Sequence, residues 1–317
     1  MDQQAVTRAT VPDRVSAAPD RGTVRLALTV GGLVLAVLLG FGLGRLGGGG
    51  PVAPVGLETT TDHTHAPGTA PHDHGAVAGQ AASAEAGGLA ISSAGYTLTP
   101  LASEFTPGRP GSLRFQIRDA QRRPVTRFAV VHDKPMHLIV VRRDLTGYQH
   151  LHPTMAPDGT WSVPLTLAQP GAWRAYADFT VVADDGTQTA LTLGADLVAP
   201  GDYAPRPLPA AAATATVDGF TVDHQGTPQV GASVPLTFRI TAGGGIPTLE
   251  RYLGAYGHLV ALREGDLGYL HVHPEPELVD GAARFWLTTP GPGRYRLYLD
   301  FQVAGVVRTA EFTVTVP

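Results

Sequence analysis

Apolar and polar residues alternate along much of the chain beyond residue 90. Residues 113–117 read Leu-Arg-Phe-Gln-Ile and residues 161–167 read Trp-Ser-Val-Pro-Leu-Thr-Leu, so every second residue is large and apolar. A period of two is typical of strands that bury one face, and the Asp-Gly and Pro-Gly pairs between such runs mark turns. No helical period appears outside one N-terminal stretch. The pattern therefore predicts an all-β protein.

Two segments of the chain repeat each other. Residues 137–153 (HLIVVRRDLTGYQHLHP) align without gaps on residues 258–274 (HLVALREGDLGYLHVHP), and both contain Gly-Tyr-x-His-x-His-Pro. The match continues upstream and downstream, which predicts two copies of one domain at 93–200 and 216–317, joined by a Pro/Ala-rich spacer at 201–215. Each copy, here called repeat 1 and repeat 2, has about 100 residues and about seven short strands, which fits an immunoglobulin-like β-sandwich.

The N-terminal stretch predicts a membrane anchor. Residues 26–44 carry no charge and lie between Arg25 and Arg45. A bilayer core needs about 20 such residues in a helix. Arginines are frequent in residues 1–25 and absent between Arg45 and Arg109, so the positive-inside rule predicts a cytoplasmic tail and extracytoplasmic repeats. A cleaved signal peptide is the alternative, and it predicts the same side of the membrane.

Residues 45–92 predict a disordered linker, because Gly, Ala, Pro, Thr and Ser dominate them and large apolar residues are few. The linker contains four histidines, His63, His65, His72 and His74. Short His-rich tracts often bind metal ions, since neutral imidazole is a common ligand. The other interpretation is a solvated spacer that happens to be rich in histidine.

Composition excludes several kinds of function. The chain has no cysteine, which rules out disulfides, thiolate metal sites and cysteine nucleophiles. Its charged fraction is 16% and its net charge is −4, without the basic patch that a nucleic-acid partner would need. No serine-hydrolase, zinc-protease or phosphate-loop motif is present, and we expect no enzymatic activity.

The repeated histidines predict a metal site in each repeat. If the hairpin of repeat 1 is symmetric about residues 144 and 145, Ile139 lies opposite His150 and His137 lies opposite His152. Tyr148, His150 and His152 then share one face by parity. The same register in repeat 2 brings three more histidines together. Clustered imidazoles suit Cu²⁺ or Zn²⁺. The candidate ligands of the repeats are His137, His150, His152, His258, His271 and His273.

Other side chains near these histidines could complete a site. Asp178 and Asp300 are either ligands or acceptors that orient an imidazole ring. Repeat 1 adds His132, and also Met136 and Met155, whose thioethers would suit Cu⁺. The alternative is that the histidines and tyrosines simply pack on an amphipathic strand face, and that the duplication copied a structural feature.

The motifs MHLIVVRRDLTGYQHLHP and PGAWRAYADF, with their counterparts YLGAYGHLVALREGDLGYLHVHP and PGRYRLYLDFQVAGVVRTAEF, resemble a largely uncharacterised family of membrane-anchored actinobacterial proteins. The sandwich pattern is similar to YtkA-like domains and, more loosely, to CopC-like periplasmic copper proteins. This resemblance implies an extracytoplasmic location, a β-sandwich fold and an association with copper.

Taken together, these observations predict a single-pass membrane protein that binds a metal ion outside the cytoplasm. Copper is the expected ion and zinc is the alternative, for capture or for delivery to an envelope protein or metal transporter. The competing hypothesis is an interaction module that presents two sandwich domains to an envelope partner.

Overall fold

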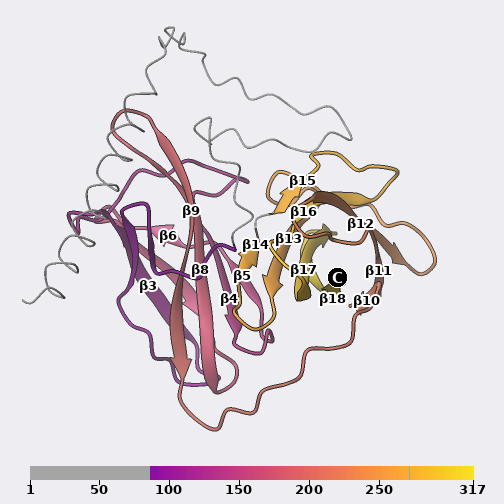
Figure 1. Cartoon of the computed structure of the whole chain (residues 1–317), viewed down its shortest axis with the longest axis horizontal. Helices are drawn as coiled ribbons and strands as arrows, with labels where there is room; N and C mark the ends of the chain where they lie inside the picture. Colours follow the sequence, from indigo (N-terminus) through magenta and orange to yellow (C-terminus); the bar gives the residue numbers. More distant parts are fainter. Residues whose placement is uncertain (1–85, 271) are drawn as a thin grey trace, which may run out of the picture. The chain divides into compact units, whose positions relative to one another are not determined.

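The computed structural model describes residues 86–270 and 272–317. The regular secondary structure of these residues consists of β-strands, as predicted (Figure 1). The strands of repeat 1 are β1 (Ser92–Ser93), β2 (Tyr96–Pro100), β3 (Gly111–Arg118), β4 (His137–Arg142), β5 (Gln149–Leu151), β6 (Thr154–Met155), β7 (Thr160–Leu165), β8 (Gly171–Val182) and β9 (Gln188–Ala199). Those of repeat 2 are β10 (Thr214–Val217), β11 (Phe220–Gln225), β12 (Ser233–Ala242), β13 (His258–Arg263), β14 (Tyr269–Leu270), β15 (Val272–Pro274), β16 (Ala283–Thr288), β17 (Gly293–Val303) and β18 (Val306–Val316).

Each repeat consists of two antiparallel sheets. In repeat 1 the orders are β1-β2-β3-β7-β6 and β5-β4-β8-β9, and in repeat 2 they are β10-β11-β12-β16-β15 and β14-β13-β17-β18. The first, second, fifth and fourth strands of an immunoglobulin domain form one sheet, and the third, sixth and seventh form the other. The strands β2, β3, β7 and β6 and the strands β4, β8 and β9 reproduce this division, so the predicted immunoglobulin-like sandwich is confirmed.

A further mark of this fold lies at the start of the sixth strand. The Tyr295 hydroxyl donates to the Gly291 carbonyl at 2.7 Å, which is the tyrosine corner of immunoglobulin-like domains. In repeat 1 the equivalent position is Trp173, whose indole N–H donates to the Gln169 carbonyl at 3.1 Å. The two repeats therefore close the same corner with different side chains.

Each repeat has a core of its own between its two sheets. Alternate residues of β3 and β7, including Phe115 and Trp161, fill the core of repeat 1. Phe238 of β12 and Phe285 of β16 hold the corresponding places in repeat 2. These are the alternating positions of the sequence, so period-two alternation predicted the inward faces correctly.

A third apolar cluster joins the two repeats. Strand β4 is buried along its whole length, because its second face packs against repeat 2. The cluster combines side chains from both repeats, Ile139, Val141, Leu145 and Tyr176 with Val260, Leu262, Leu267, Tyr269 and Tyr298. Burying one large apolar side chain contributes about 1.5–3 kcal/mol, so this contact fixes the two sandwiches together.

The contact between the repeats has approximate two-fold symmetry. The Tyr176 hydroxyl donates to the Leu267 carbonyl, and the equivalent Tyr298 hydroxyl donates to the Leu145 carbonyl, both at 2.6 Å. The ring of Tyr148 stacks on Tyr298 with centroids 4.1 Å apart. The symmetric pair, Tyr269 and Tyr176, has centroids 5.6 Å apart. The repeats thus pair through equivalent surfaces, as the subunits of a two-fold dimer do.

The symmetry also corrects the ungapped alignment of the hairpin turns. The alignment sets Asp144 against Gly265, whereas the structure makes Asp144 equivalent to Asp266, since each pairs with the arginine that ends its strand. Leu145 and Leu267 then follow with left-handed φ angles of 63° and 64°. Compared with repeat 1, repeat 2 has one residue more between the strand-ending arginine and this Asp-Leu pair, and one residue fewer between the pair and the following tyrosine.

Residues 86–90 form a strap across the repeats, although the sequence predicted linker up to residue 92. Gly87 exchanges two backbone hydrogen bonds with Tyr269 of repeat 2, of 2.8 and 3.0 Å. The Gly88 amide donates to the Thr192 carbonyl of repeat 1 at 3.0 Å. Gly88 has a φ of 68°, and a Cβ there would lie 2.3 Å from the Tyr176 ring. Glycine is therefore needed for this close approach.

Several predictions fall on residues outside the described part. They are the anchor at 26–44, most of the linker with His63, His65, His72 and His74, and His271. Within the described residues, no helix is long and apolar enough to cross a membrane.

Candidate metal site between the repeats

The hairpin of β4 and β5 has the register that the sequence predicts. Ile139 pairs with His150 and Leu138 with Leu151. Leu138 and Leu151 pack in or against the core of repeat 1. By alternation, His150 points to the opposite face of the sheet, where Ile139 contacts repeat 2. The histidines of the hairpin are therefore directed at the contact between the repeats.

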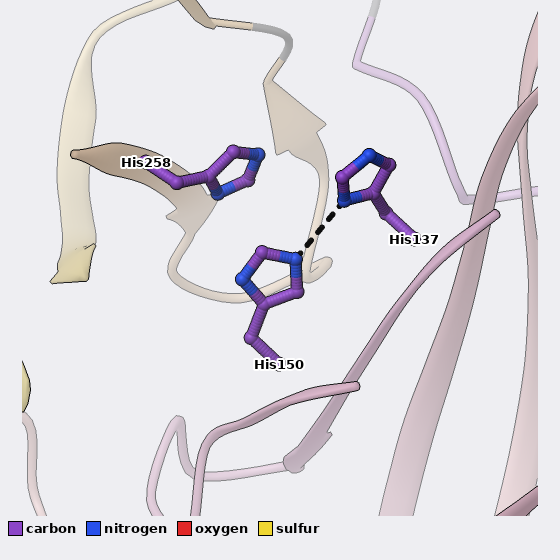
Figure 2. Close-up of side chains that lie close together, drawn as sticks. All are labelled: His137, His150 and His258. Carbon is purple, nitrogen blue, oxygen red and sulfur yellow. Dashed lines mark hydrogen bonds between the residues drawn. The ribbon is translucent and has the colours of Figure 1, made fainter. Parts of the chain in front are cut away.

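Three histidines converge there from both repeats. His137 of β4, His150 of β5 and His258 of β13 each offer a ring nitrogen, and these nitrogens all lie within 4.8 Å of one another (Figure 2). The rings of His137 and His258 are parallel within 4°, with centroids 5.5 Å apart. The candidate site therefore combines histidines from two repeats, where the sequence predicted a separate set in each.

The outer nitrogens of two of these rings are held by hydrogen bonds. His137 Nε2 lies 3.0 Å from the Val131 carbonyl oxygen, which can only accept, so this nitrogen carries the proton. His150 Nδ1 lies 2.8 Å from Asp300 Oδ2. The inner nitrogens, His137 Nδ1 and His150 Nε2, then face each other at 3.2 Å. With both rings neutral, two lone pairs point at one another, so a proton or a metal ion has to lie between them.

Asp300 is the carboxylate at the centre of this arrangement. It is 2% exposed and belongs to repeat 2, whereas His150 belongs to repeat 1. Besides His150, it accepts hydrogen bonds from the Thr309 hydroxyl at 2.6 Å and the Tyr148 hydroxyl at 3.3 Å. Burial, followed by the Asp300 charge, raises the pKa of Tyr148 well above its usual value. The sequence allowed Asp300 to be either a metal ligand or an acceptor that orients an imidazole ring. The geometry favours the second role, with His150 as the oriented ring.

Asp178 is the symmetric counterpart in repeat 1. It lies opposite His137 in the ladder of β4 and β8, as Asp300 lies opposite His258 in that of β13 and β17. Its carboxylate accepts a hydrogen bond from the Thr192 hydroxyl at 2.8 Å. Together with burial, Asp178 raises the pKa of Tyr269, across the contact, well above its usual value. Two carboxyl groups thus flank the histidine cluster.

His137 and the neighbouring His152 are neutral at pH 7. Burial is the main cause that lowers the pKa of His137 to about 4, and the nearby His150 lowers it further. Burial also lowers the pKa of His152 to about 3, with the neighbouring His150 and His137 contributing. The ring of His152 lies 4.8 Å from that of His150, and its Nε2 is buried without a hydrogen-bond partner. Neutral imidazole is the form that binds metal.

Two further rings border the cluster. The ring of His132 lies 6.2 Å from those of both His137 and His258. The Tyr252 ring of repeat 2 lies 6.3 Å from that of His150. The sequence offered no sign of Tyr252, because its place depends on how the repeats pair.

Three predicted ligands lie elsewhere. Met136, which is fully buried, and Met155 pack in or against the core of repeat 1, because adjacent strand residues point to opposite faces and Met136 precedes His137. Thioether ligation by these residues is therefore wrong. His273 is exposed and pairs with Trp286 in the other sheet of repeat 2, because the chain changes sheets between β14 and β15. The expected pairing of His258 with His273 is also wrong.

A family model described as Domain of unknown function (DUF8832) matches residues 91–196 and, a second time, residues 215–317. The chain belongs to this family. The two matches confirm the tandem repeat, and both copies of the DUF8832 domain contribute histidines to the cluster. The resemblance to actinobacterial membrane-anchored proteins and to CopC-like proteins gains no support from the comparisons. A search of curated proteins found no match.

Among solved structures, the chain is similar to FdeC, an Escherichia coli adhesin, with 17% identity and a TM-score of 0.23 over 72% of this chain and 66% of that one. It is similar to invasin, a bacterial integrin-binding protein, with 14% identity and a TM-score of 0.22 over 70% and 39%. The chain thus spans less than two thirds of either protein. The D0-D1 domains of intimin give 13% identity and a TM-score of 0.21 over 69% and 96%. No functional inference follows from likeness at this level.

Proposed function

We propose that this protein binds a divalent transition-metal ion, Cu²⁺ or Zn²⁺, between its two repeats. The observation that carries the proposal is the 3.2 Å contact between His137 Nδ1 and His150 Nε2. Two imidazole nitrogens bound to one tetrahedral ion at about 2.0–2.1 Å lie about 3.3 Å apart. The contact therefore has the length of one edge of a tetrahedral metal site.

The surroundings of the two rings support the same proposal. Metal-bound histidines usually donate their other ring N–H to a carboxylate or a backbone carbonyl, which fixes the tautomer. Asp300 and the Val131 carbonyl supply these two acceptors. His258 offers a third nitrogen, and the ring of His152 borders this set of three, 4.8 Å from that of His150.

Charge and donor type narrow the identity of the ion. Asp300 is buried and Asp178 lies close enough to affect His137, and a buried carboxylate is costly without a compensating charge. A divalent cation balances both. The donors are imidazoles, with no cysteine in the chain and with Met136 and Met155 in the core, which favours Cu²⁺ or Zn²⁺ over Cu⁺.

We further propose that the protein is anchored by residues 26–44 and holds this site outside the cytoplasm, where it captures metal or delivers it to an envelope protein or metal transporter. The uncharged run and the arginine asymmetry support this topology. Protease added to intact spheroplasts should remove both repeats and leave a short protected fragment. Full protection of the repeats would contradict the topology.

A second candidate function rests on the pair of His150 and Asp300. If His150 carries protons on both nitrogens, it bonds His137 and Asp300 at once without any metal ion. The histidines then hold the repeats together, and the protein serves as an interaction module that presents two joined sandwiches to an envelope partner.

Metal titration separates the two functions. The chain is prepared with His63, His65, His72 and His74 replaced by Ala, so that the linker cannot bind, and is titrated with Cu²⁺ and Zn²⁺. We expect one tight site, which is lost in His137→Ala/His258→Ala. The matched control is His224→Ala/His273→Ala, which removes two histidines of repeat 2 outside the cluster and should leave affinity unchanged. No binding, or equal binding by the cluster variant, would favour the interaction module.

A further inference from the structure

One turn connects the buried histidines with the surface. The metal site has little exposure of its own, since His137 is 4% exposed and the His150 side chain is 3% exposed. His132 is half-buried and belongs to the turn from Val131 to Lys134, whereas His137, His150 and His258 belong to strands. Val131 and Asp133, on either side of His132, are exposed.

The ring of His132 is placed to receive an ion from the site. Its centroid is equidistant, at 6.2 Å, from those of His137 and His258, and its plane is tilted by 74° and 78° to theirs. Those two rings are parallel to each other, so His132 lies across the edge of the pair. It lies outside the three-nitrogen cluster and, unlike the histidines of that cluster, it belongs to a turn whose neighbouring residues are exposed.

The turn is also coupled to a ligand. The Val131 carbonyl accepts the Nε2 proton of His137, so a movement of the turn releases the outer side of that ring. The turn is held by two backbone hydrogen bonds between Val131 and Lys134, of 3.0 and 3.1 Å. His132 and Asp133 both have left-handed φ angles, 49° and 61°, which are unfavourable for residues with a side chain. A strained surface turn is the kind of segment that opens locally at low cost.

Repeat 2 has the equivalent turn, with less strain and no imidazole. Tyr252 and Ala255 close it, and Leu253 and Gly254 take the left-handed positions with φ angles of 59° and 83°. Leu253 is 7% exposed and has no group that binds metal, and Gly254 adopts its conformation without strain. Of the two equivalent turns, the one in repeat 1 therefore has the imidazole, and it has two strained residues where repeat 2 has one.

We propose that the turn Val131–Lys134 is the gate of the metal site, and that His132 is the transfer ligand through which Cu²⁺ or Zn²⁺ enters and leaves. This inference rests on the proposed metal site. His132 binds the ion transiently, during entry and exit. It therefore accelerates both uptake and release and leaves the equilibrium affinity nearly unchanged.

The test uses the full chain with the four linker histidines replaced by Ala, loaded with Cu²⁺ and followed by its visible absorbance. Uptake of Cu²⁺ and its removal by excess chelator are measured by stopped flow. His132→Leu places in repeat 1 the residue that repeat 2 has at the equivalent left-handed position, so we expect it to fold. Both rates should fall about tenfold or more while Kd changes by about threefold or less, as when binding requires a conformational change. His224→Leu, the same change in a histidine outside the cluster, should leave both rates unchanged.

Chemical rescue distinguishes a transfer ligand from a residue with a purely structural role, because added imidazole replaces only the lost metal-binding group. In His132→Ala, free imidazole should restore the lost rate, and it should not accelerate exchange in His224→Ala. Unchanged rates in both His132 variants would overturn the proposal. A weaker Kd with faster release would overturn it too, because His132 would then be a resident ligand. Failure of the proposed function is distinguishable, since the parent chain with His132 intact would then bind no Cu²⁺.

Discussion

The bond between His150 and Asp300 gives the sharpest test of the site. In Asp300→Asn the shape is kept, but the negative acceptor of the His150 Nδ1 proton is lost from a position that is 2% exposed. Removing such an outer partner of a metal-bound histidine usually costs about 10- to 100-fold in affinity, or about 1.4–2.7 kcal/mol. We expect Cu²⁺ affinity to fall by this amount at pH 7.5, measured by competition with a chelator of known affinity.

Tyr148→Phe is the matched control. It removes the other hydrogen bond from repeat 1 to Asp300 Oδ2, of 3.3 Å, and retains the stacking of the ring on Tyr298. Since a contact of this length is weak, affinity should change by roughly threefold or less. Equal affinity of Asp300→Asn and the parent protein would refute the argument, because His150 would then not be the oriented ligand.

The same variant distinguishes a metal ion from a proton. If His150 is doubly protonated in the metal-free protein, Asp300→Asn removes one partner of a buried ion pair and should lower the free energy of unfolding by about 3–5 kcal/mol. If both rings are neutral and await a metal ion, the metal-free protein should lose much less. Urea unfolding of the two metal-free proteins measures the difference.

Two further predictions concern stability. The folded-state pKa of His137 is about 4 and an unfolded histidine has a pKa of about 6.5, so the unfolded chain binds more protons between these values. The free energy of unfolding of the metal-free protein should therefore fall as pH drops from 6.5 through 4, by roughly 3 kcal/mol for this residue. In His137→Gln this part of the pH dependence should be absent, as measured by urea unfolding at pH 7.5 and 4.5. A difference in stability between the two proteins that does not vary with pH would contradict the prediction. Gly88→Ala should lower the melting temperature more than Gly95→Ala. Both glycines have left-handed φ angles, 68° and 82°, but only at Gly88 would the added Cβ lie 2.3 Å from a ring. Equal decreases in melting temperature would mean that the strap accommodates the Cβ without loss of stability.

Much of each repeat could be predicted from the sequence because it depends on local patterns. Alternation in residues 113–117 and 161–167 identified the inward faces, and the hairpin of repeat 1 set Ile139 opposite His150 as expected. The errors have local causes as well. Met136 was assigned to the site on proximity in sequence, against strand alternation. His273 was wrongly assigned to the site, because a change of sheet leaves no clear signal in the sequence.

The pairing of the repeats could not be derived from local patterns, and the metal site depends on it. His150 needs Asp300 from the other repeat, and His137 needs His258. A signal was nevertheless present. The runs HLIVV at 137–141 and HLVAL at 258–262 lack polar alternation, which is the pattern of strands buried on both faces. These two runs supply Ile139 and Val141, and Val260 and Leu262, to the contact between the repeats.

The two-fold contact within one polypeptide also has an evolutionary consequence. In a homodimer, any substitution appears on both sides of the axis, so a residue near the axis must suit two places at once. Fusion of the two copies in tandem removes this constraint. His132 and Leu253 occupy equivalent left-handed positions in this chain and differ in chemistry. Tandem fusion thus lets one half carry an imidazole at this position while the other half buries a leucine there.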